Sequence, residues 1–424
     1  MRATFVISSM RGGGSERVVS HMANYWARRG WSITIVTVGH GPDAPSYPLD
    51  PRVAHRDMRF SRAAKQPIPS AASLNAVKRI FDACSPPERR RLLLEMHLVA
   101  ALRRAIAATR PEVIISFINA TNVRTLLATR GLGVPVIVSE RTDPYRDTLN
   151  EGMRRLRRRL YPHAAAVVCQ TREIGAFFAD AAGDRVRVIH NPVLPPTFRR
   201  ESDAVPANVA AGRRLIGMGR LAEEKGFTLL VRAFAAIAGR HPSWSLEIWG
   251  EGPQRPRLER LIRSLKVQDR VRLPGFTNWP LEVLRRADLF GLSSLSEGFP
   301  NALCEAMACG VPAVGFDCSS GVREIIRHGV DGIVVPGGDA PALAAALDRV
   351  MSSDADRQRL GARAPDVVQR FAIDHAMAQW ERLTCGPAAV AAAAPSAVSG
   401  STAAAEYPVV TPPPSAIPTR VEGL

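Results

Sequence analysis

Two glutamates eight residues apart, Glu297 and Glu305, could accept hydrogen bonds from two separate sets of hydroxyl groups. They stand in segment 296–306, where Pro300 has the fixed backbone angle that suits a first helical turn. The segment therefore predicts a short helix that begins just after Glu297, with free N–H groups able to bind a phosphate. Because an ionised carboxylate only accepts hydrogen bonds, the pair favours hydroxyls on either side of that anion. The alternative is a capping glutamate followed by a solvated one.

A second candidate is the segment 217–226, in which Arg220 and Lys225 lie five residues apart on a glycine-framed turn. Two cations at this spacing can meet one diphosphate, Arg220 as a bidentate fork and Lys225 as a compact point charge. Only four of the 56 basic residues are lysines, which favours a phosphate role for Lys225. Two solvated surface cations are the alternative.

Glycines at 12–14 follow the first apolar run of the chain and precede a helical pattern. Glycines at such a junction let the backbone approach a ligand closely, and the helix start adds N–H donors. Segment 10–17 has neither the glycine spacing of a dinucleotide-binding motif nor the GKS/T of a P-loop. It predicts a turn beside a phosphate or, alternatively, a merely flexible turn.

The elements that must position these groups alternate short β-branched runs with amphipathic stretches, the pattern of parallel sheets flanked by helices. One series fills the first half of the chain and a second fills the later half, which predicts two doubly wound α/β domains. The predicted strands are Thr4–Ser8, Ile33–Val38, Val113–Phe117, Val136–Ser139, Ala166–Cys169, Val186–Ile189, Leu215–Met218, Leu246–Trp249, Val271–Leu273, Leu289–Leu292, Ala313–Phe316 and Ile333–Val335. Helices are predicted over Glu16–Arg29, Leu229–Ala238 and Leu343–Met351.

Composition divides the chain further. The last 39 residues hold seven prolines and almost no charge, which predicts a disordered tail. The predicted parts are a first domain at 1–193, a proline-containing linker at 194–211, a second domain at 212–371, a final helix at 372–385 and the tail at 386–424.

Charge and hydropathy limit the class of protein. Residues 1–193 hold 30 basic and 15 acidic residues, whereas residues 194–424 hold 26 and 24, so nearly all of the net charge of +17 lies in the first half. No run approaches the roughly 18 apolar residues of a spanning helix, so the cytoplasm is the expected compartment. The six cysteines lack metal-ligand spacing and are expected to be reduced core residues.

Five motifs occur in order over nearly all of residues 1–385: GGGSERV at 12–18, GRLAEEKG at 219–226, WGEGP at 249–253, LPGF at 273–276 and EGFPNALCEA at 297–306. Together they resemble the retaining nucleotide-sugar glycosyltransferases of the GT-B fold, of the family-4 type found in polysaccharide and glycolipid assembly. The resemblance implies two Rossmann-like domains that face each other across a cleft. It also implies transfer of a hexosyl or N-acetylhexosaminyl group from a nucleotide-sugar, with UDP expected, to a lipid-linked glycan or a polysaccharide precursor.

The same resemblance implies roles for single residues. Arg220 and Lys225 would hold the donor diphosphate, Glu297 the hydroxyls of the transferred sugar and Glu305 those of the ribose. Cations and a helix N-terminus would then stabilise the leaving diphosphate, so neither a metal nor a cofactor besides the nucleotide-sugar is expected. Further donor contacts would come from Gly13, Gly14, Gly275, Phe276, Gly298, Phe299, Asn301 and Ala302.

One position departs from that family. Many relatives carry a histidine after the fourth or fifth N-terminal strand, whereas here Glu140 and Arg141 follow the strand 136–139. Glu140 is therefore the candidate catalytic residue at this position, and a surface Glu–Arg pair is the alternative. His190, at the end of the last N-terminal strand, is expected to shape the hinge.

Arginines crowd the stretch Leu149–Pro162, where Leu149, Met153, Leu156 and Leu160 form one helical stripe. Such a helix can lie in the interface of an anionic bilayer, which would make the protein peripheral on the inner face of the plasma membrane. The alternative is that the stripe packs on the N-terminal domain and the arginines are solvated. The candidate membrane or acceptor residues are Arg154, Arg155, Arg157, Arg158 and Arg159.

Two other functions fit parts of the sequence. A nucleotide-sugar epimerase would share the fold, but the GRL…EKG turn and the paired glutamates favour transfer. A basic scaffold that binds nucleic acid or membrane without catalysis would explain the charge. Nucleic acid is not the expected partner, because aromatic residues are only 6% of the chain and leave few stacking platforms.

Overall fold

The computed structural model describes residues 1–39, 45–58, 86–146, 149–198 and 212–385, with the backbone alone for residues 86–94. The predicted tail, most of the predicted linker and Cys84 lie outside this range. Contacts join both halves of the described chain into one unit, Met1–Thr384.

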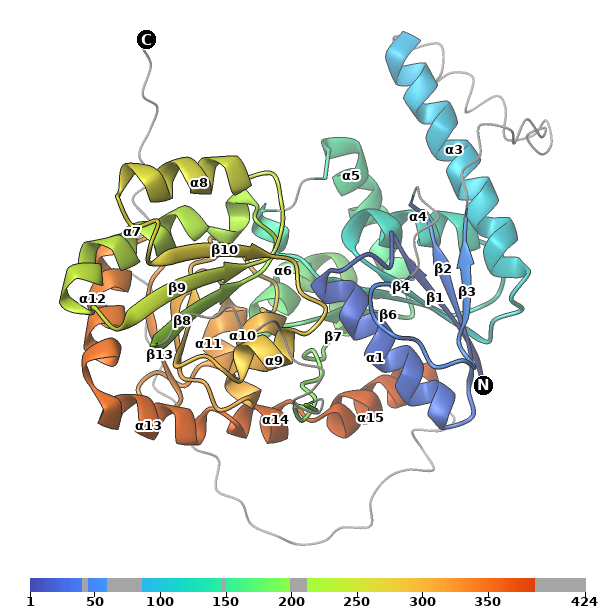
Figure 1. Cartoon of the computed structure of the whole chain (residues 1–424). Helices are drawn as coiled ribbons and strands as arrows, with labels where there is room; N and C mark the ends of the chain where they lie inside the picture. The colour runs from blue at the N-terminus through green and yellow to red at the C-terminus, as the bar shows by residue number, and fades with distance from the viewer. Residues whose placement is uncertain (40–44, 59–85, 147–148, 199–211, 386–424) are drawn as a thin grey trace, which may run out of the picture. The chain divides into compact units, whose positions relative to one another are not determined.

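The first half forms a parallel sheet in the order β3-β2-β1-β4-β5-β6-β7 (Figure 1). Its strands are short and rich in valine and isoleucine, and most are buried on both faces, as in a sheet covered by helices on each side. The strands are β1 (Arg2–Ile7), β2 (Ser32–Thr37), β3 (Ala54–Asp57), β4 (Val113–Phe117), β5 (Val136–Ser139), β6 (Ala166–Cys169) and β7 (Val186–Val188).

Alternate side chains of β1 enter two different cores. Phe5 and Ile7 pack with α1 (Gly14–Arg28), whereas Val6 packs with the helices of the opposite face. The helices of that opposite face are α3 (Pro86–Ala107), α4 (Asn119–Thr129), α5 (Glu151–Leu160) and α6 (Arg172–Ala182).

The second half forms another parallel sheet, in the order β10-β9-β8-β11-β12-β13. Its strands are β8 (Arg213–Met218), β9 (Trp244–Trp249), β10 (Val271–Gly275), β11 (Leu289–Leu292), β12 (Ala313–Asp317) and β13 (Gly332–Pro336). One face packs on α7 (Phe227–Ile237), α8 (Arg255–Ser264), α12 (Ala340–Ser352) and α13 (Asp354–Arg363). The other face packs on α9 (Pro280–Leu284), α10 (Asn301–Ala308), α11 (Ser320–Ile325) and α14 (Asp366–Arg370).

The last helix, α15 (Ile373–Thr384), belongs to the core of the first sheet. Met377 and Trp380 are buried there with α1. The Tyr25 hydroxyl donates to Asp374 at 2.7 Å, and Trp26 Nε1 donates to Glu381 at 3.1 Å. The chain thus returns to its first domain after completing the second.

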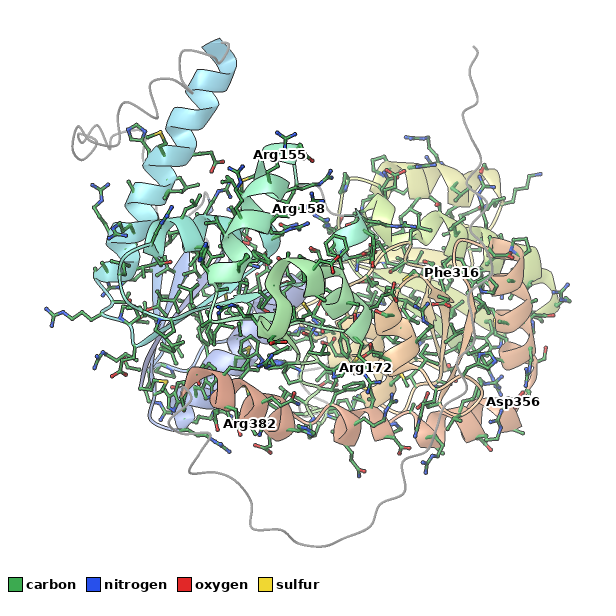
Figure 2. All side chains as sticks on the ribbon, turned by 180° about the vertical axis from the view of Figure 1, so that it is seen from behind. Arg155, Arg158, Arg172, Phe316, Asp356 and Arg382 are labelled. Atoms are coloured by element: carbon green, nitrogen blue, oxygen red, sulfur yellow. The ribbon has the colours of Figure 1, made fainter. Side chains whose placement is uncertain are left out.

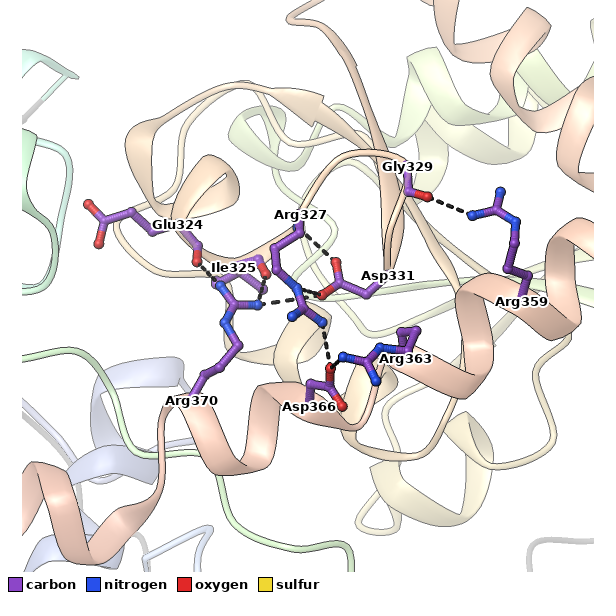
Figure 3. Close-up of polar contacts among 9 residues, drawn as sticks. All are labelled: Glu324, Ile325, Arg327, Gly329, Asp331, Arg359, Arg363, Asp366 and Arg370. Carbon is purple, nitrogen blue, oxygen red and sulfur yellow. Dashed lines mark hydrogen bonds and ion pairs between the residues drawn. The ribbon is translucent and has the colours of Figure 1, made fainter. Parts of the chain in front are cut away.

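Ion pairs fix the segment before α15 to the second sheet (Figure 3). Asp331 is fully buried and accepts from Arg327 Nε at 2.6 Å, and Arg327 Nη2 reaches Asp366 of α14 at 2.7 Å. Arg370 donates to the backbone carbonyls of Glu324 and Ile325. A buried carboxylate needs such partners, so this network anchors α14 on the loops of the second domain.

The two-domain α/β fold predicted from the sequence is confirmed. All twelve predicted strands are present, several extended by one or two residues, and β3 was missed. The sequence 54–57 reads AHRD and is half exposed at the sheet edge, so it lacks the apolar run that marks the other strands. Within the described residues, no helix is both long and apolar enough to cross a bilayer.

Candidate active site

The turn that carries Arg220 and Lys225 packs on the loop after β11. Gly226 has a φ of +58°, and a Cβ there would overlap the Ser293 carbonyl, so this position requires glycine. Ser293 Oγ donates to the Lys225 carbonyl at 3.0 Å, and the Leu295 amide donates to the Glu224 carbonyl at 2.7 Å. These bonds hold the turn against the loop that leads to Glu297.

Lys225 and Glu297 meet as a result. Lys225 Nζ lies 2.6 Å from Glu297 Oε1, and the Ser294 hydroxyl donates to the same oxygen at 2.7 Å. Both side chains are largely shielded, with 24% and 11% exposed. A charge-assisted pair of this kind is short and directional, so it fixes the position of both groups before a ligand arrives.

The WGEGP motif, at the end of β9, supports the same turn through backbone contacts. Gly250 has a φ of +141°, and a Cβ there would overlap the Gly219 carbonyl. The Gly219 amide donates to Trp249 O and the Leu221 amide to Glu251 O, both at 2.9 Å. Arg220 itself is exposed and pairs with Glu224 at 2.6 Å, so its guanidinium is free to exchange that partner for a solvent-side anion.

The segment 297–301 lies against the first domain. A Cβ on Gly298 would lie 2.8 Å from the Arg141 carbonyl and would overlap Gln170. The Asn301 amide nitrogen donates to Gly14 O at 2.9 Å, and its oxygen accepts from Asn191 at 2.8 Å. Asn301 and Ala302 begin α10, whose first turn has no side-chain cap, as the predicted phosphate-binding helix requires.

Glu305 has a partner that the sequence did not predict. Its carboxylate forms an ion pair with Arg17 of α1, and both side chains are less than one-fifth exposed. Arg17 also lies over the Tyr47 ring, 4.9 Å from its centroid. Arg17 occurs in the GGGSERV motif, but the spacing of that motif gives no sign of which residue it meets.

The glycine-rich turn covers a buried acid. Glu16 is about one-tenth exposed, and Ser9 donates to its carboxylate at 3.3 Å. Burial raises the pKa of Glu16, and the nearby charge of Arg220 opposes that rise. Gly13 lies so close that a Cβ would overlap the Glu16 carboxylate, while a Cβ on Gly12 would contact Phe276 at 3.7 Å.

Gly275 and Phe276 end β10 beside this turn. Gly275 has a φ of +99°, and its carbonyl accepts from the Gly250 amide at 2.8 Å. Phe276 is 59% exposed, which leaves its ring available to a ligand. The predicted donor residues Gly13, Gly14, Phe276 and Asn301 therefore lie on neighbouring loops.

A chain of buried polar side chains was not predicted. Arg141 and Gln170 both donate to Asn191 Oδ1, and Asn191 donates to Asn301. Arg141 is fully enclosed, and burial lowers its pKa to about 9. Its Nε and Nη2 atoms have no hydrogen-bond partner among the described residues. From the sequence, His190 was expected to shape the hinge after β7, and the neighbouring Asn191 was given no role in the site.

Two predicted site residues bury their side chains. Glu140 is 1% exposed, accepts from the Tyr161 hydroxyl and lies 3.3 Å from Asn122 Nδ2, so its side chain belongs to the core of the first domain. This burial excludes the alternative of a surface Glu–Arg pair. Phe299 is 5% exposed, and its ring packs on Phe371, so its side chain stabilises the second domain.

The arginine-rich helix also differs from the expectation of a membrane-lying helix. The stripe formed by Met153, Leu156 and Leu160 packs on the core of the first domain, because α5 rests against α4. Arg157 is buried, with its guanidinium over the Phe178 ring. The exposed arginines of α5 are Arg154, Arg155, Arg158 and Arg159, of which Figure 2 labels two.

Metal ligands do not gather in the described part of the chain. Those residues contain no group of three or more His, Cys, Asp or Glu side chains placed to hold an ion. Cys169 and Cys304 are buried, and burial raises the pKa of both thiols.

Two family descriptions account for most of the chain. Residues 12–195 match the family described as Glycosyltransferase Family 4, and residues 199–367 match Glycosyl transferases group 1. The chain belongs to the GT-B glycosyltransferases. In this GT-B protein the first family match covers the first sheet except β1, and the second covers the candidate residues Arg220, Lys225, Glu297 and Glu305.

Two curated relatives have names that state a substrate or product class. An exopolysaccharide phosphotransferase of Streptomyces coelicolor is 30% identical over 411 residues, which cover 90% of this chain but 40% of that protein. A Campylobacter jejuni enzyme is 24% identical over 90% of this chain and 98% of its own length. Its name is GalNAc-alpha-(1->4)-GalNAc-alpha-(1->3)-diNAcBac-PP-undecaprenol alpha-1,4-N-acetyl-D-galactosaminyltransferase. The chain thus spans less than half of the first relative and nearly all of the second.

Solved structures share the fold. Anabaena HepE in complex with UDP-glucose superposes with a TM-score of 0.71 at 21% identity and covers 91% of this chain and all of that one. Staphylococcus aureus TarM gives the same TM-score at 11% identity, over 91% of this chain and 99% of that chain. At these identities the likeness supports the GT-B architecture alone.

Proposed function

We propose that this GT-B protein is a retaining glycosyltransferase that moves a hexosyl or N-acetylhexosaminyl group from a UDP-sugar to a lipid-linked glycan or polysaccharide precursor. The observation that carries the proposal is the Lys225–Glu297 pair beside the uncapped start of α10. Such a pair next to a helix start would offer a diphosphate a cation and helix N–H groups, and would offer sugar hydroxyls a carboxylate.

The donor diphosphate would lie between Lys225, Arg220 and the first turn of α10. Negative charge on that diphosphate grows as the bond to the sugar breaks, so fixed cations stabilise the transition state more than the ground state. Glu297, held by Lys225 and Ser294, would accept from sugar hydroxyls. Glu305 would accept from the ribose, sharing its carboxylate with Arg17.

This arrangement supplies charge stabilisation without a metal, and we propose that none is needed. The leaving diphosphate would be neutralised by one lysine, one arginine and the α10 dipole. Retention by front-side attack, as the family resemblance implies, requires no covalent intermediate on a protein carboxylate. Glu297 then acts as a binding group rather than as a nucleophile.

The choice of donor and acceptor rests on similarity. HepE binds UDP-glucose, and the Campylobacter relative is named for an undecaprenol-linked acceptor. An acceptor of that kind would bring the enzyme to the cytoplasmic face of the plasma membrane as a peripheral protein. The excess of basic residues in the first half supports contact with anionic acceptor or membrane groups.

Two glutamate variants test the assignment. Glu305→Ala should weaken binding of UDP and UDP-sugars alike, whereas Glu297→Ala should spare UDP and weaken only the sugar-bearing donor. Calorimetry with UDP, UDP-glucose and UDP-N-acetylglucosamine measures both, and equal losses for all ligands in both variants would contradict the two roles.

Product analysis separates transfer from epimerisation. Incubation of the full chain with a bound donor and a lipid-linked diphosphate acceptor should yield UDP and an extended acceptor with the anomeric configuration retained. An epimerised sugar in place of transfer would support the alternative enzyme. Activity that survives EDTA is expected, and a strict need for Mg²⁺ or Mn²⁺ in the chemical step would contradict the metal-free mechanism.

A further inference from the structure

An open groove lies at the N-terminal ends of β5 and β6. The glycine-rich turn lies at the opposite, C-terminal ends of the strands of the same sheet. Its volume is about 630 Å³. Part of its wall is formed by Pro135 before β5, Val136 of β5 and Ala165 before β6, and the C-terminal ends of α4 and α5 complete it. Apolar side chains make most of its floor: Leu126, Leu127, Val134, Val136, Leu156 and Leu160.

Basic side chains surround this floor. Arg130, Arg159, Arg185 and His163 line the groove, and no described Asp or Glu does. The side chains of Arg130 and Arg159 make no hydrogen bond or ion pair with the described residues. An exposed cation without a partner carries little desolvation penalty when it meets an anion, so both are available to a ligand.

The groove is formed before any ligand binds. Arg103 of α3 donates to the carbonyls of Ala128 and Arg130 at 2.9 and 2.7 Å, which ties the end of α4 in place. Gly131 and Gly133 have φ values of +76° and +68°, so the turn that follows needs glycine at both positions. Because the backbone of this wall is already fixed, binding of a ligand would lose little conformational entropy there.

We propose that this groove binds an anionic glycerophospholipid of the membrane. The phosphate would lie among Arg130, Arg159 and Arg185, and the first carbons of one acyl chain would cover Leu127 and Leu160. The lining has no Phe, Tyr or Trp to stack a base and no carboxylate to hold sugar hydroxyls. An apolar floor with a cationic rim instead matches a molecule that is anionic at one end and apolar at the other.

This site goes beyond the proposed function and would seat the enzyme on a membrane by a different route from a helix lying flat in the bilayer. The apolar stripe of α5 already packs inward, so α5 offers its exposed arginines and the end of the groove. The groove also lies at the opposite ends of the strands from Gly13, Asn191 and Gln170, which follow the C-terminal ends of β1, β7 and β6. Loss of lipid binding should therefore leave donor binding unchanged.

Co-sedimentation with vesicles tests the proposal. The full chain should pellet with vesicles of phosphatidylglycerol and phosphatidylcholine, and not with phosphatidylcholine alone. The double variant Arg130→Gln/Arg159→Gln should bind about 30-fold more weakly, as expected for two basic residues near an anionic surface. The matched control Arg155→Gln/Arg158→Gln removes the same charge from α5 outside the groove and should lose less than about 5-fold. Equal losses in both variants would overturn a discrete site.

A soluble lipid tests the apolar floor. Dihexanoyl-phosphatidylglycerol should bind at least 10-fold more tightly than glycerol 1-phosphate by calorimetry, and Leu127→Asn should remove that difference. Equal affinity for the two probes would reduce the groove to a phosphate site and overturn the proposal, as would no binding of either. Unchanged UDP-glucose affinity in every variant keeps this outcome separate from that of the proposed function.

Discussion

The strands β1 and β8 hold the same position in the two sheets, yet the turns that follow them are built differently. After β1, the glycine-rich turn is joined to Ser46 by one backbone bond and one side-chain bond: the Ser46 amide donates to the Met10 carbonyl at 3.0 Å, and the Gly12 amide donates to Ser46 Oγ at 2.9 Å. After β8, the turn is held mainly by backbone bonds to two neighbouring loops, supported by the bond from Ser293 Oγ, with Gly226 packed on the Ser293 carbonyl.

The difference indicates a division of work between the two domains. The first turn exposes backbone and keeps its acid, Glu16, buried beneath it. The second turn is a rigid platform that presents Arg220 and Lys225 as charges. A backbone that only has to approach a ligand tolerates adjustment, whereas electrostatic stabilisation of a leaving group requires charges fixed in advance.

The largest effect on catalysis is expected from a change in the turn after β8. Lys225→Ala should lower kcat by about 100- to 1,000-fold, the range for removing one fixed charge-stabilising group, and should raise the donor KM by less. The charge matters most when the bond to the leaving diphosphate breaks. Steady-state kinetics with a UDP-sugar measure both constants.

A control variant separates the specific effect of Lys225 on kcat from a general loss of positive charge. Arg232 is an exposed cation on α7, and Arg232→Ala should leave kcat within about twofold of the parent. If Lys225→Ala raised KM alone, Lys225 would bind ground state and transition state equally, and the platform would have no special role in the chemistry.

The two turns should also differ in their tolerance of a methyl group. Gly226→Ala forces a left-handed φ on alanine and an overlap with backbone, so we expect a loss of about 2–3 kcal/mol in unfolding free energy. Gly13 has an extended φ of −131°, and its Cβ would meet only the end of the Glu16 side chain. Gly13→Ala should cost less than about 1 kcal/mol.

Urea unfolding of the two glycine variants measures the contrast. The same loss in both would mean that the first turn is as rigid as the second, and the comparison would fail.

Sequence reasoning recovered the groups that act within one loop or between adjacent motifs. Strand periodicity placed the two segments at the carboxyl ends of β8 and β11, and the family resemblance implied that Lys225 and Glu297 bind one donor. The sequence could not reveal that Arg17 meets Glu305, because these residues lie more than 250 positions apart. Nor could it reveal that Asn191 joins Arg141 to Asn301, because Asn191 lies 50 positions from Arg141 and 110 from Asn301, in separate elements of the fold.

The burial of Glu140 and the inward packing of α5 have physical causes as well. Glu140 follows a strand end, where a polar residue usually faces a ligand, but Tyr161 and Asn122 offer hydrogen bonds that keep its carboxylate in the core. In α5, one helical stripe fitted both a bilayer and a protein core. Because α4 lies against α5, the stripe packs in the protein core. The sequence of α5 alone contains no information about this neighbouring helix.

A smaller effect is expected at the ion pair of Arg17 and Glu305, which joins the two domains. Glu305→Gln should weaken UDP binding by about 10- to 150-fold, equivalent to the loss of hydrogen bonds to a charged group at about 1.5–3 kcal/mol. Arg17→Gln should change it less than 5-fold, because the carboxylate can still serve the ribose without its arginine. Calorimetry with UDP checks both, and a larger loss for Arg17→Gln would place the main nucleotide contact on the first domain.

The smallest expected effect concerns pH and the helices that follow the two turns. Every buried residue of α7 is apolar, whereas α1 encloses His21, whose pKa burial lowers to about 4. Below its ordinary pKa of 6.5, the unfolded chain binds a proton at His21 that the folded chain does not take up until about pH 4, so stability falls as the pH falls.

Between pH 7.5 and pH 5, this difference in proton uptake amounts to about 2 kcal/mol of unfolding free energy. Glu16 acts in the opposite direction, because a raised pKa makes the folded chain bind its proton first, so the total pH dependence of the protein does not isolate His21. His21→Gln does isolate it: the variant should lose about 2 kcal/mol less than the parent over this range in urea unfolding. His375→Gln, which removes an exposed histidine of α15, should behave like the parent. If His21→Gln also matched the parent, the imidazole would be solvated in the folded protein. The histidine of α1 would then contribute nothing to the pH dependence of the unfolding free energy, as is expected for α7.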